Sequence, residues 1–164
     1  MLVFLDVDGT VIPFGGPGPY PEYGPRDGAV AHPLLGRVDP GLGARLGALG
    51  CELVWATTWL DDANEVLSPW LGLPSLPVVD WPDPRLSERG EVRLLHWKTR
   101  ALVRWAAGRV FVWLDDEITG ADRDWVAAHH PAPALLHRVD HRYGLTDADF
   151  AVLAEWLSGG PGVR

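Results

Sequence analysis

The 164-residue sequence predicts one α/β domain, residues 1–164, with a three-layer, Rossmann-like arrangement and a mainly parallel five-stranded sheet. Three observations support this fold class. Short apolar runs alternate with capped, amphipathic segments along the whole chain. Hydrophobic residues make up 47% of the chain and charged residues 22%, which is typical of a globular protein. The length is that of a single domain.

Strand and helix signals alternate along the chain, with one long exception. Residues 11–40 are dense in glycine and proline, which predicts an irregular loop or flap, and loops of that length are usually functional. The predicted elements are, in order, strand 2–7, helix 39–49, strand 52–56, helix 60–67 ending before Pro69, strand 76–79, helix 94–107, strand 110–114, helix 121–128, strand 134–138 and a last helix ending at Gly159.

The strands are predicted from short, continuously apolar runs, which are typical of parallel strands buried on both faces. The run over 2–7 is the clearest of them. Strands connected by helices favour a parallel sheet with right-handed crossovers. In such sheets the binding site lies beyond the carboxyl ends of the strands. The residues that follow each run are therefore the candidates for chemistry.

The helices are predicted from capping signals and from the spacing of apolar residues. Asp39-Pro40 is an N-cap followed by a first-turn proline, and Thr146 caps the last helix with Asp149 at its third position. The helix over 94–107 has apolar residues along one face. We expect that face, which begins with Trp97, to pack in the core; the alternative is that Trp97, beside Lys98, forms a wall of the pocket.

Composition excludes several classes of protein. The net charge of −8 excludes a broadly basic protein that coats nucleic acid, and it gives no reason to expect a membrane partner. No apolar run approaches the roughly 18 residues of a membrane span. The single cysteine, Cys51, can form neither an internal disulfide nor a thiolate zinc site. Met1 leads directly into the first strand without a basic signal-peptide region, so we expect a cytoplasmic protein.

Acidic and hydroxyl residues follow three of the predicted strands. Asp6 and Asp8 follow the first strand on the same side of the chain, and Gly9 then lets the backbone turn sharply. The strands over 52–56 and 110–114 are followed by Thr57-Thr58 and Asp115-Asp116. If these strands are neighbours, all of these groups converge.

Carboxylates gathered in one place repel one another unless a cation lies among them. Ligands that are all oxygen select a hard ion, and Mg²⁺ is the usual one at a phosphoryl site. The hydroxyl of Thr57 and the ammonium of Lys98, the only lysine, would supply donors to a bound anion. Acids, a metal ion, a hydroxyl and a lysine are what phosphoryl transfer through an aspartyl-phosphate requires.

Each of these residues also has an interpretation without chemistry. The two acids after the first strand could belong to a turn or a calcium loop, although an EF-hand has its glycine at the sixth position and Gly9 stands at the fourth. Thr57 could be a β-branched strand residue, as could Thr58. Lys98 could be an exposed helix cation, and the acids after residue 114 could begin a helix.

Taken together, the motifs resemble the haloacid dehalogenase (HAD) superfamily of phosphohydrolases. The matching motifs stand in the order Asp6-Val7-Asp8-Gly9-Thr10, Thr57, Lys98 and Asp115-Asp116, and the resemblance covers residues 2 to at least 116. It implies the HAD-like fold. Dehalogenase members lack the second aspartate of the first motif, so Asp8 favours a phosphatase.

The resemblance also implies roles for the individual residues. Asp6 would attack phosphorus, and Asp8 would protonate the leaving oxygen and later deprotonate water. Thr57 would hydrogen-bond a phosphoryl oxygen, and Lys98 would neutralise charge on Asp6 and the phosphoryl group. The implied Mg²⁺ ligands are the Asp6 carboxylate, the Asp8 carbonyl and the Asp115 carboxylate, with Asp116 bound through water or paired with Lys98.

Two stretches carry a closer resemblance. Trp55-Ala56-Thr57-Thr58-Trp59 with Ala63-Asn64, and Trp113-Leu114-Asp115-Asp116-Glu117, are similar to the small HAD domain of bacterial RNA-repair proteins. HAD phosphatases often carry a cap domain after the first motif or between the second and third. Both gaps are too short here for a folded cap, so we expect no large cap and an open site.

An open site favours a phosphate at the end of a larger molecule over a small metabolite. Trp59 and Trp81 are candidates to stack on a terminal base, and Arg142 is a candidate phosphate contact. The other predicted substrate-binding residues are Gly9, Thr10 and Thr58.

We therefore expect a Mg²⁺-dependent phosphatase that hydrolyses a phosphate monoester, on a small molecule or a nucleic-acid end, through an aspartyl-phosphate. The alternatives are a catalytically idle HAD-like module that binds a phosphorylated ligand or partner, and a small-metabolite phosphatase. The charge of −8 predicts few phosphate contacts and no stable nucleic-acid complex. The oligomeric state has no signal in the sequence.

Overall fold

A computed structural model of the chain describes residues 1–24, 32–82 and 95–160. The sheet has four strands, all parallel, in the order β2-β1-β3-β4. They are β1 (Leu2–Leu5), β2 (Glu52–Trp55), β3 (Phe111–Asp115) and β4 (Ala134–Arg138). Because β1 lies between β2 and β3, the ends of these three strands are neighbours.

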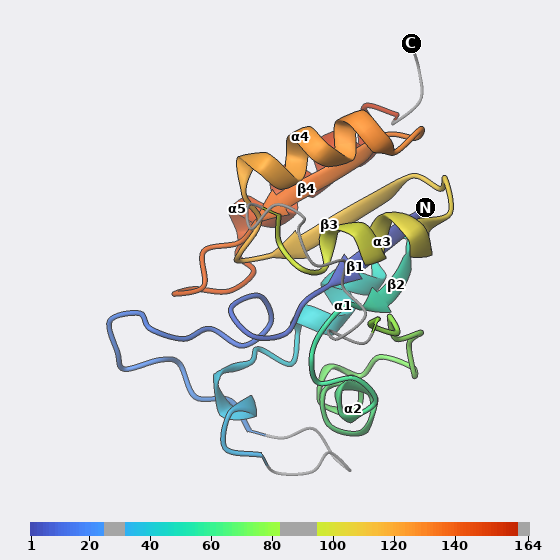
Figure 1. Cartoon of the computed structure of the whole chain (residues 1–164). Helices are drawn as coiled ribbons and strands as arrows, with labels where there is room; N and C mark the ends of the chain where they lie inside the picture. Colours follow the sequence, from blue (N-terminus) through green and yellow to red (C-terminus); the bar gives the residue numbers. More distant parts are fainter. Residues whose placement is uncertain (25–31, 83–94, 161–164) are drawn as a thin grey trace.

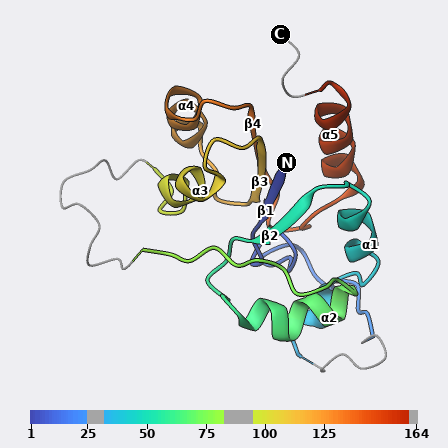
Figure 2. The same cartoon turned by 90° about the vertical axis from the view of Figure 1, so that its right-hand side faces the viewer.

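Helices cover both faces of the sheet, which confirms the predicted α/β arrangement in three layers (Figure 1). In the turned view of Figure 2, α3 and α4 lie on one side of the strands and α1 and α5 on the other. The helices are η1 (Leu35–Arg37), α1 (Leu42–Gly47), η2 (Ala63–Leu67), α2 (Ser68–Leu71), α3 (Thr99–Ala106), α4 (Gly120–His129) and α5 (Asp147–Ser158).

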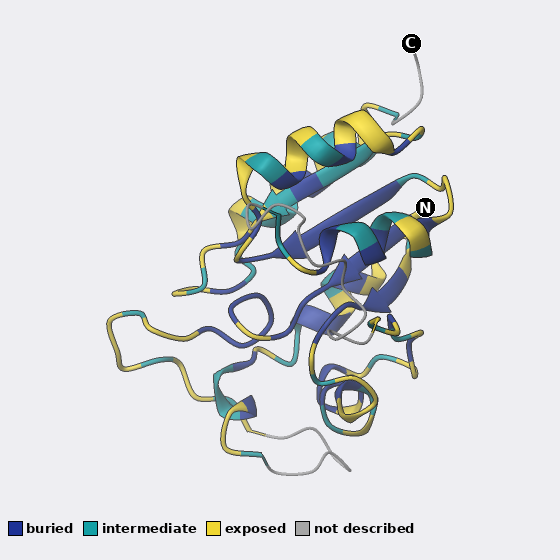
Figure 3. Ribbon diagram, in the orientation of Figure 1, coloured by how far each residue is buried: buried dark blue, intermediate teal, exposed yellow. Residues whose placement is uncertain are grey.

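The two faces of the sheet form two separate apolar cores. Alternate strand residues point to opposite faces. Val3 and Leu5 join the core with α1 and α5, whereas Leu2 and Phe4 join the core with α3 and α4. All residues of β1 and β3 are buried (Figure 3), as expected for central parallel strands. The sheet is therefore a rigid base for the residues that follow its strands.

The predicted fifth strand is wrong. Residues 76–79 form one bridge to Trp55 instead of a strand. The side chain of Asn64 takes both backbone groups of Leu76, accepting from its N–H at 2.8 Å and donating to its carbonyl at 2.8 Å. Pro77 has no N–H to offer to a ladder. Hydrogen bonds from a side chain 12 residues away therefore occupy Leu76, and the strand pairing is reduced to the single bridge between Trp55 and Val78.

The predicted end of the second helix, before Pro69, is also wrong. A wide π-type turn, η2, runs directly into α2, and the helix ends only at Gly72, which has a positive φ of 67°. Pro69 is tolerated because it occupies the first turn of α2, where a backbone N–H has no helical partner.

The third predicted helix begins later than expected. Its predicted start at residue 94 lies outside the described residues, and residues 95–98 form a turn before α3. Trp97 is consequently 51% exposed instead of packed in the core. The apolar spacing does continue correctly into Ala101 and Leu102, which are buried.

The last helix follows the prediction. The Thr146 hydroxyl and the Asp149 carboxylate form the capping box of α5. In the described part of 11–40, the only helix is the short η1, so this part holds no folded cap. Across the described ranges, no helix combines the length and the apolar character needed to cross a bilayer.

Candidate active site

The acidic residues meet at the carboxyl ends of neighbouring strands. Asp6 directly follows β1, and Asp115 is the last residue of β3 beside it. The backbone N–H of Asp6 donates to the Leu114 carbonyl at 3.1 Å, which continues the pairing of the two strands. Thr57 follows β2 on the other side of β1. The predicted meeting of the three strand ends is confirmed, but the expectation that all of their side chains converge is wrong for Asp8 and Thr58, which are exposed.

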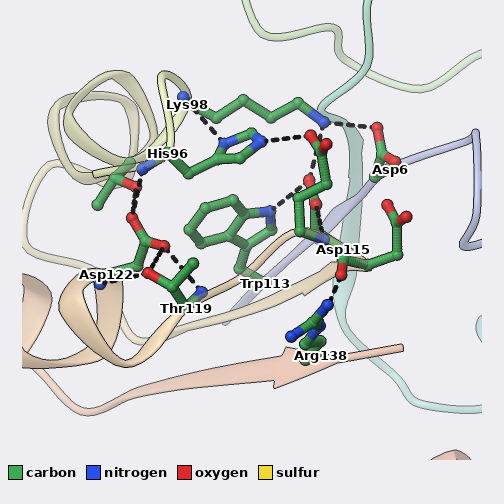
Figure 4. A network of polar contacts seen from close by, with 11 residues as sticks. Asp6, His96, Lys98, Trp113, Asp115, Thr119, Asp122 and Arg138 are labelled. Atoms are coloured by element: carbon green, nitrogen blue, oxygen red, sulfur yellow. Dashed lines mark hydrogen bonds and ion pairs between the residues drawn. The ribbon is translucent and has the colours of Figure 1, made fainter. Parts of the chain in front are cut away.

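Lys98 joins the two acids across the site (Figure 4). Its Nζ donates to Asp6 Oδ1 at 2.5 Å and to Asp115 Oδ2 at 2.8 Å. All three side chains are buried. The interpretation of Lys98 as an exposed helix cation is therefore wrong: its ammonium lies inside the protein between two carboxylates.

Burial and mutual repulsion shift the pKa values of these groups. Burial raises the pKa of Asp6 to about 7, against the attraction of the Lys98 ammonium and with a further rise from Asp115. Burial opposes the charge of Lys98, but the two carboxylates outweigh it and raise the pKa of the ammonium. Burial and then the charge of Asp115 also raise the pKa of Asp116. One ammonium is thus too little positive charge for three carboxylates.

The donor set at this place fits a hard divalent cation. Carboxylate oxygens of Asp6, Asp115 and Asp116 lie within 4.8 Å of one another. Oxygen ligands of this kind suit Mg²⁺. A second group, His96, Asp115 and Glu117, shares Asp115 with the first. The chemistry of the first group and its shortage of positive charge are what a Mg²⁺ site requires.

Gly9 is required where the first motif turns. Its φ is +77°, and an added Cβ would lie 2.5 Å from the Asp116 carboxyl carbon. Any side chain at this position would therefore both strain the backbone and displace Asp116. The sequence predicts the turn. The structure adds that the turn lies against one of the predicted metal ligands.

The side chain of Asp8 does not join the acid cluster. Asp8 is exposed, and its Oδ2 accepts a hydrogen bond from the indole N–H of Trp59 at 3.0 Å. The two carboxylates of the first motif therefore have different surroundings, one buried beside Lys98 and one exposed beside Trp59. Different surroundings are what two different roles in catalysis require.

The second motif separates its two threonines. Thr57 is completely buried, and its Oγ1 accepts from the backbone N–H of Trp59 at 3.2 Å, while Thr58 is exposed. The carbonyl of Thr57 accepts from the Trp81 indole at 3.0 Å. Both tryptophans that the sequence suggests for stacking therefore use their N–H groups to hold this site together.

Two other predicted substrate contacts are placed less favourably. Thr10 is fully buried, and its Oγ1 has no hydrogen-bond partner. The guanidinium of Arg142 binds the Asp140 carboxylate, with Nε at 2.9 Å from Oδ1, so its charge is already balanced. A hollow of about 910 Å³ is lined by residues such as Tyr20 and Arg37 and by none of the acid cluster.

A hydrogen-bond network that the sequence did not predict anchors Lys98 (Figure 4). Asp122, fully buried in α4, accepts from the His96 N–H at 2.8 Å and from the Thr99 hydroxyl at 2.6 Å. His96 Nδ1 accepts from the Lys98 N–H at 3.2 Å, and its Nε2 lies 3.0 Å from Glu117 Oε2. The spacing of Thr119 and Asp122 in the sequence is that of a helix capping box. The Asp122 carboxylate completes this cap and also accepts the hydrogen bonds from His96 and Thr99.

One comparison with known families gives a match. The model of a family described as "HAD domain in Swiss Army Knife RNA repair proteins" matches residues 2–150. The match spans nearly the whole described chain, including every residue of the site. No curated protein and no solved structure matches the chain.

Proposed function

The chain belongs to the family of HAD domains in Swiss Army Knife RNA repair proteins, and from this we propose that it is a Mg²⁺-dependent phosphatase acting through an aspartyl-phosphate on Asp6. The family suggests a phosphohydrolase. The observation that carries the finer proposal is the position of the Lys98 ammonium, 2.5 Å from Asp6 Oδ1 and 2.8 Å from Asp115 Oδ2. A phosphoryl group beside Asp6 would meet that ammonium directly.

The proposed reaction has two steps. An Asp6 oxygen forms a bond to phosphorus, the bond to the leaving oxygen breaks, and Asp8 gives that oxygen a proton. Asp8 then takes a proton from a water molecule, whose oxygen attacks phosphorus and breaks the bond to Asp6. Inorganic phosphate is released and both carboxyl groups return to their first state.

The surroundings of each residue suit its proposed role. Asp6 is buried and held by Lys98, so its attacking oxygen has a defined position. Asp8 is exposed, so it can exchange protons with water, while the Trp59 indole orients it. The Asp6, Asp115 and Asp116 carboxylates with the Asp8 carbonyl would hold Mg²⁺, which when bound neutralises charge on the phosphoryl oxygens.

The proposed substrate is a phosphate monoester at the end of a nucleotide or nucleic acid. The family description names RNA repair proteins. The exposure of Asp8 and Thr58 leaves the leaving-group side open, so a large alcohol could depart from it. The net charge of −8 argues against a long nucleic-acid footprint, so we propose that only the terminal nucleotide is bound.

The test compares Asp6→Asn with Asp124→Asn, which changes an exposed carboxylate of α4 in the same way. Phosphate release from nucleoside monophosphates with Mg²⁺ should fall below about one per cent of wild type in Asp6→Asn and stay normal in Asp124→Asn. After acid quenching, phosphate label from the substrate should remain on wild type and be absent from Asp6→Asn.

Retained turnover in Asp6→Asn would exclude Asp6 as the nucleophile. A protein that binds phosphate esters with Mg²⁺ but turns none of them over would instead be the idle binding module. Circular dichroism of each variant shows that the fold is kept.

A further inference from the structure

Trp97 has an unusual position for a large aromatic side chain. It is 51% exposed, although its sequence neighbour Lys98 is buried in the acid cluster. Isolated exposed hydrophobic residues need no explanation, but this one directly precedes a lysine that binds two buried carboxylates. The Nζ of Lys98 lies over the Trp97 ring, 5.5 Å from the ring centroid.

Two neighbouring rings hold the Trp97 indole in place. Trp81 meets it edge-on, with centroids 4.8 Å apart and planes at 69°, and His96 lies 5.7 Å away at 32°. Both supports are themselves fixed: the Trp81 indole donates to the Thr57 carbonyl at 3.0 Å, and the His96 N–H donates to Asp122 at 2.8 Å. The exposed ring is therefore preorganised and needs little ordering when a ligand binds.

The other tryptophans near the site are less suited to stack on a ligand. Trp59 uses its indole N–H to bind Asp8 and its ring to contact His32, with centroids 5.7 Å apart. Trp81 presents its ring to Trp97. Of the described tryptophans, Trp97 is the one among the exposed large hydrophobic residues.

We propose that Trp97 is the stacking platform for the base of a phosphorylated nucleoside whose phosphate lies at Asp6 and Lys98. This inference rests on the proposed phosphatase function and names its specificity residue. The ammonium lies 5.5 Å from the ring centroid, a separation that a ribose between base and phosphate can span. A base offers a flat ring to the indole and so gains stacking energy that a sugar phosphate lacks.

The charges around Trp97 favour a single phosphate. The exposed carboxylate of Glu117 lies 3.0 Å from the Nε2 atom of His96, which packs against Trp97. A second phosphate near this carboxylate would be repelled. A terminal monophosphate, on a free nucleoside or on the last residue of an oligonucleotide, is therefore favoured over a nucleoside di- or triphosphate.

The experiment compares adenosine 5′-monophosphate with ribose 5-phosphate, which has the same phosphate and sugar but no base. In Trp97→Leu, kcat/KM for the nucleotide should fall at least about tenfold more than that for ribose 5-phosphate, which corresponds to ~1.4 kcal/mol. Trp97→Phe should lose less, because it keeps a ring. Trp125→Leu, which removes an indole stacked on His129 in α4, is the matched control and should change neither value.

Two further sets of measurements distinguish a free nucleotide from an oligonucleotide end and test the role of Trp97 in binding without turnover. Adenosine 3′-monophosphate and short oligoribonucleotides with a 5′- or 3′-phosphate are measured in the same way. Calorimetric titration of adenosine monophosphate into Asp6→Asn and into Asp6→Asn/Trp97→Leu measures binding without turnover. At least about tenfold weaker binding in the double variant is expected.

The inference would be overturned if Trp97→Leu lowered kcat/KM equally for adenosine 5′-monophosphate and ribose 5-phosphate. It would also be overturned if Asp6→Asn and Asp6→Asn/Trp97→Leu bound adenosine monophosphate with equal affinity. If wild type turns over no phosphate ester, the hydrolase proposal fails by itself, and the calorimetric arm still decides the role of Trp97. A wild-type preference for ribose 5-phosphate would also overturn it.

Discussion

Removing the Asp122 carboxylate should destabilise the protein and disturb the site together. Asp122 lies in α4, is completely buried and accepts from two parts of the chain. Its Oδ2 caps α4 by accepting from the Thr119 N–H at 2.9 Å and the Thr119 hydroxyl at 2.6 Å. Its Oδ1 holds the turn before α3 through the His96 N–H and the Thr99 hydroxyl.

The size of the effect follows from these contacts. Loss of a helix cap costs about 1 kcal/mol. The half-buried N–H of His96 and the buried hydroxyl of Thr99 would each lose a charged acceptor, at about 1–2 kcal/mol apiece. We therefore expect Asp122→Ala to lower the free energy of unfolding by about 4 kcal/mol, a large part of the 5–15 kcal/mol of an ordinary domain. Because His96 and Thr99 flank Lys98, kcat should fall as well.

Urea unfolding followed by circular dichroism measures this change. Asp124→Ala, an exposed position two residues along α4, is the matched control and should stay within about 0.5 kcal/mol of wild type. Thr99→Val removes the hydroxyl that donates to Asp122. Asp122→Ala should therefore lower the free energy of unfolding by less in the Thr99→Val protein than in wild type. A loss below about 1 kcal/mol for Asp122→Ala, or the same loss in both backgrounds, would refute the proposed anchoring.

Three other predictions can be checked with similar measurements. Gly9→Ala should lose nearly all phosphatase activity, because its Cβ would lie 2.5 Å from the Asp116 carboxyl carbon at a φ of +77°; Gly47→Ala, with open space around it, should remain active. Mg²⁺ at a hundred times its Kd should raise the free energy of unfolding, measured by urea titration, by about 2.7 kcal/mol. If Mg²⁺ stabilised Asp115→Ala as much as wild type, Asp115 would be excluded as a ligand. Burial opposes the charge of Asp149, but hydrogen bonds at the start of α5 lower its pKa. The ionised Asp149 therefore stabilises the folded protein above the unfolded pKa near 4, and this stabilisation is lost as the pH falls below that value. Acid unfolding of wild type should therefore be steeper than that of Asp149→Asn.

Local signals in the sequence predicted much of the fold. The apolar runs located all four strands, and the capping box at Thr146 located the start of α5. These signals act within a few residues, through strand burial and through the unpaired N–H groups of a first helical turn. The sequence predicted no strand order; in the structure β1 lies beside β3, which makes Asp6 and Asp115 neighbours.

Other features depended on competition between distant groups. Residues 76–79 have the composition of a strand, but the Asn64 side chain takes the backbone of Leu76. Trp97 continues an apolar helical pattern, but Asp122 holds the preceding turn and α3 begins only at Thr99. Neither competitor is visible in the local pattern, because each acts from another part of the chain.

The chemical groups of the site and the strand ends that carry them can be predicted from the sequence, since acids after buried parallel strands have one edge of the sheet to share. Which of these groups pair with one another depends on the tertiary packing. Lys98 meets Asp6 across 92 residues of chain, and Trp59 meets Asp8 across 51. Such contacts depend on how helices pack onto the sheet, and hydrogen bonds of this length form only when that packing brings donor and acceptor into line.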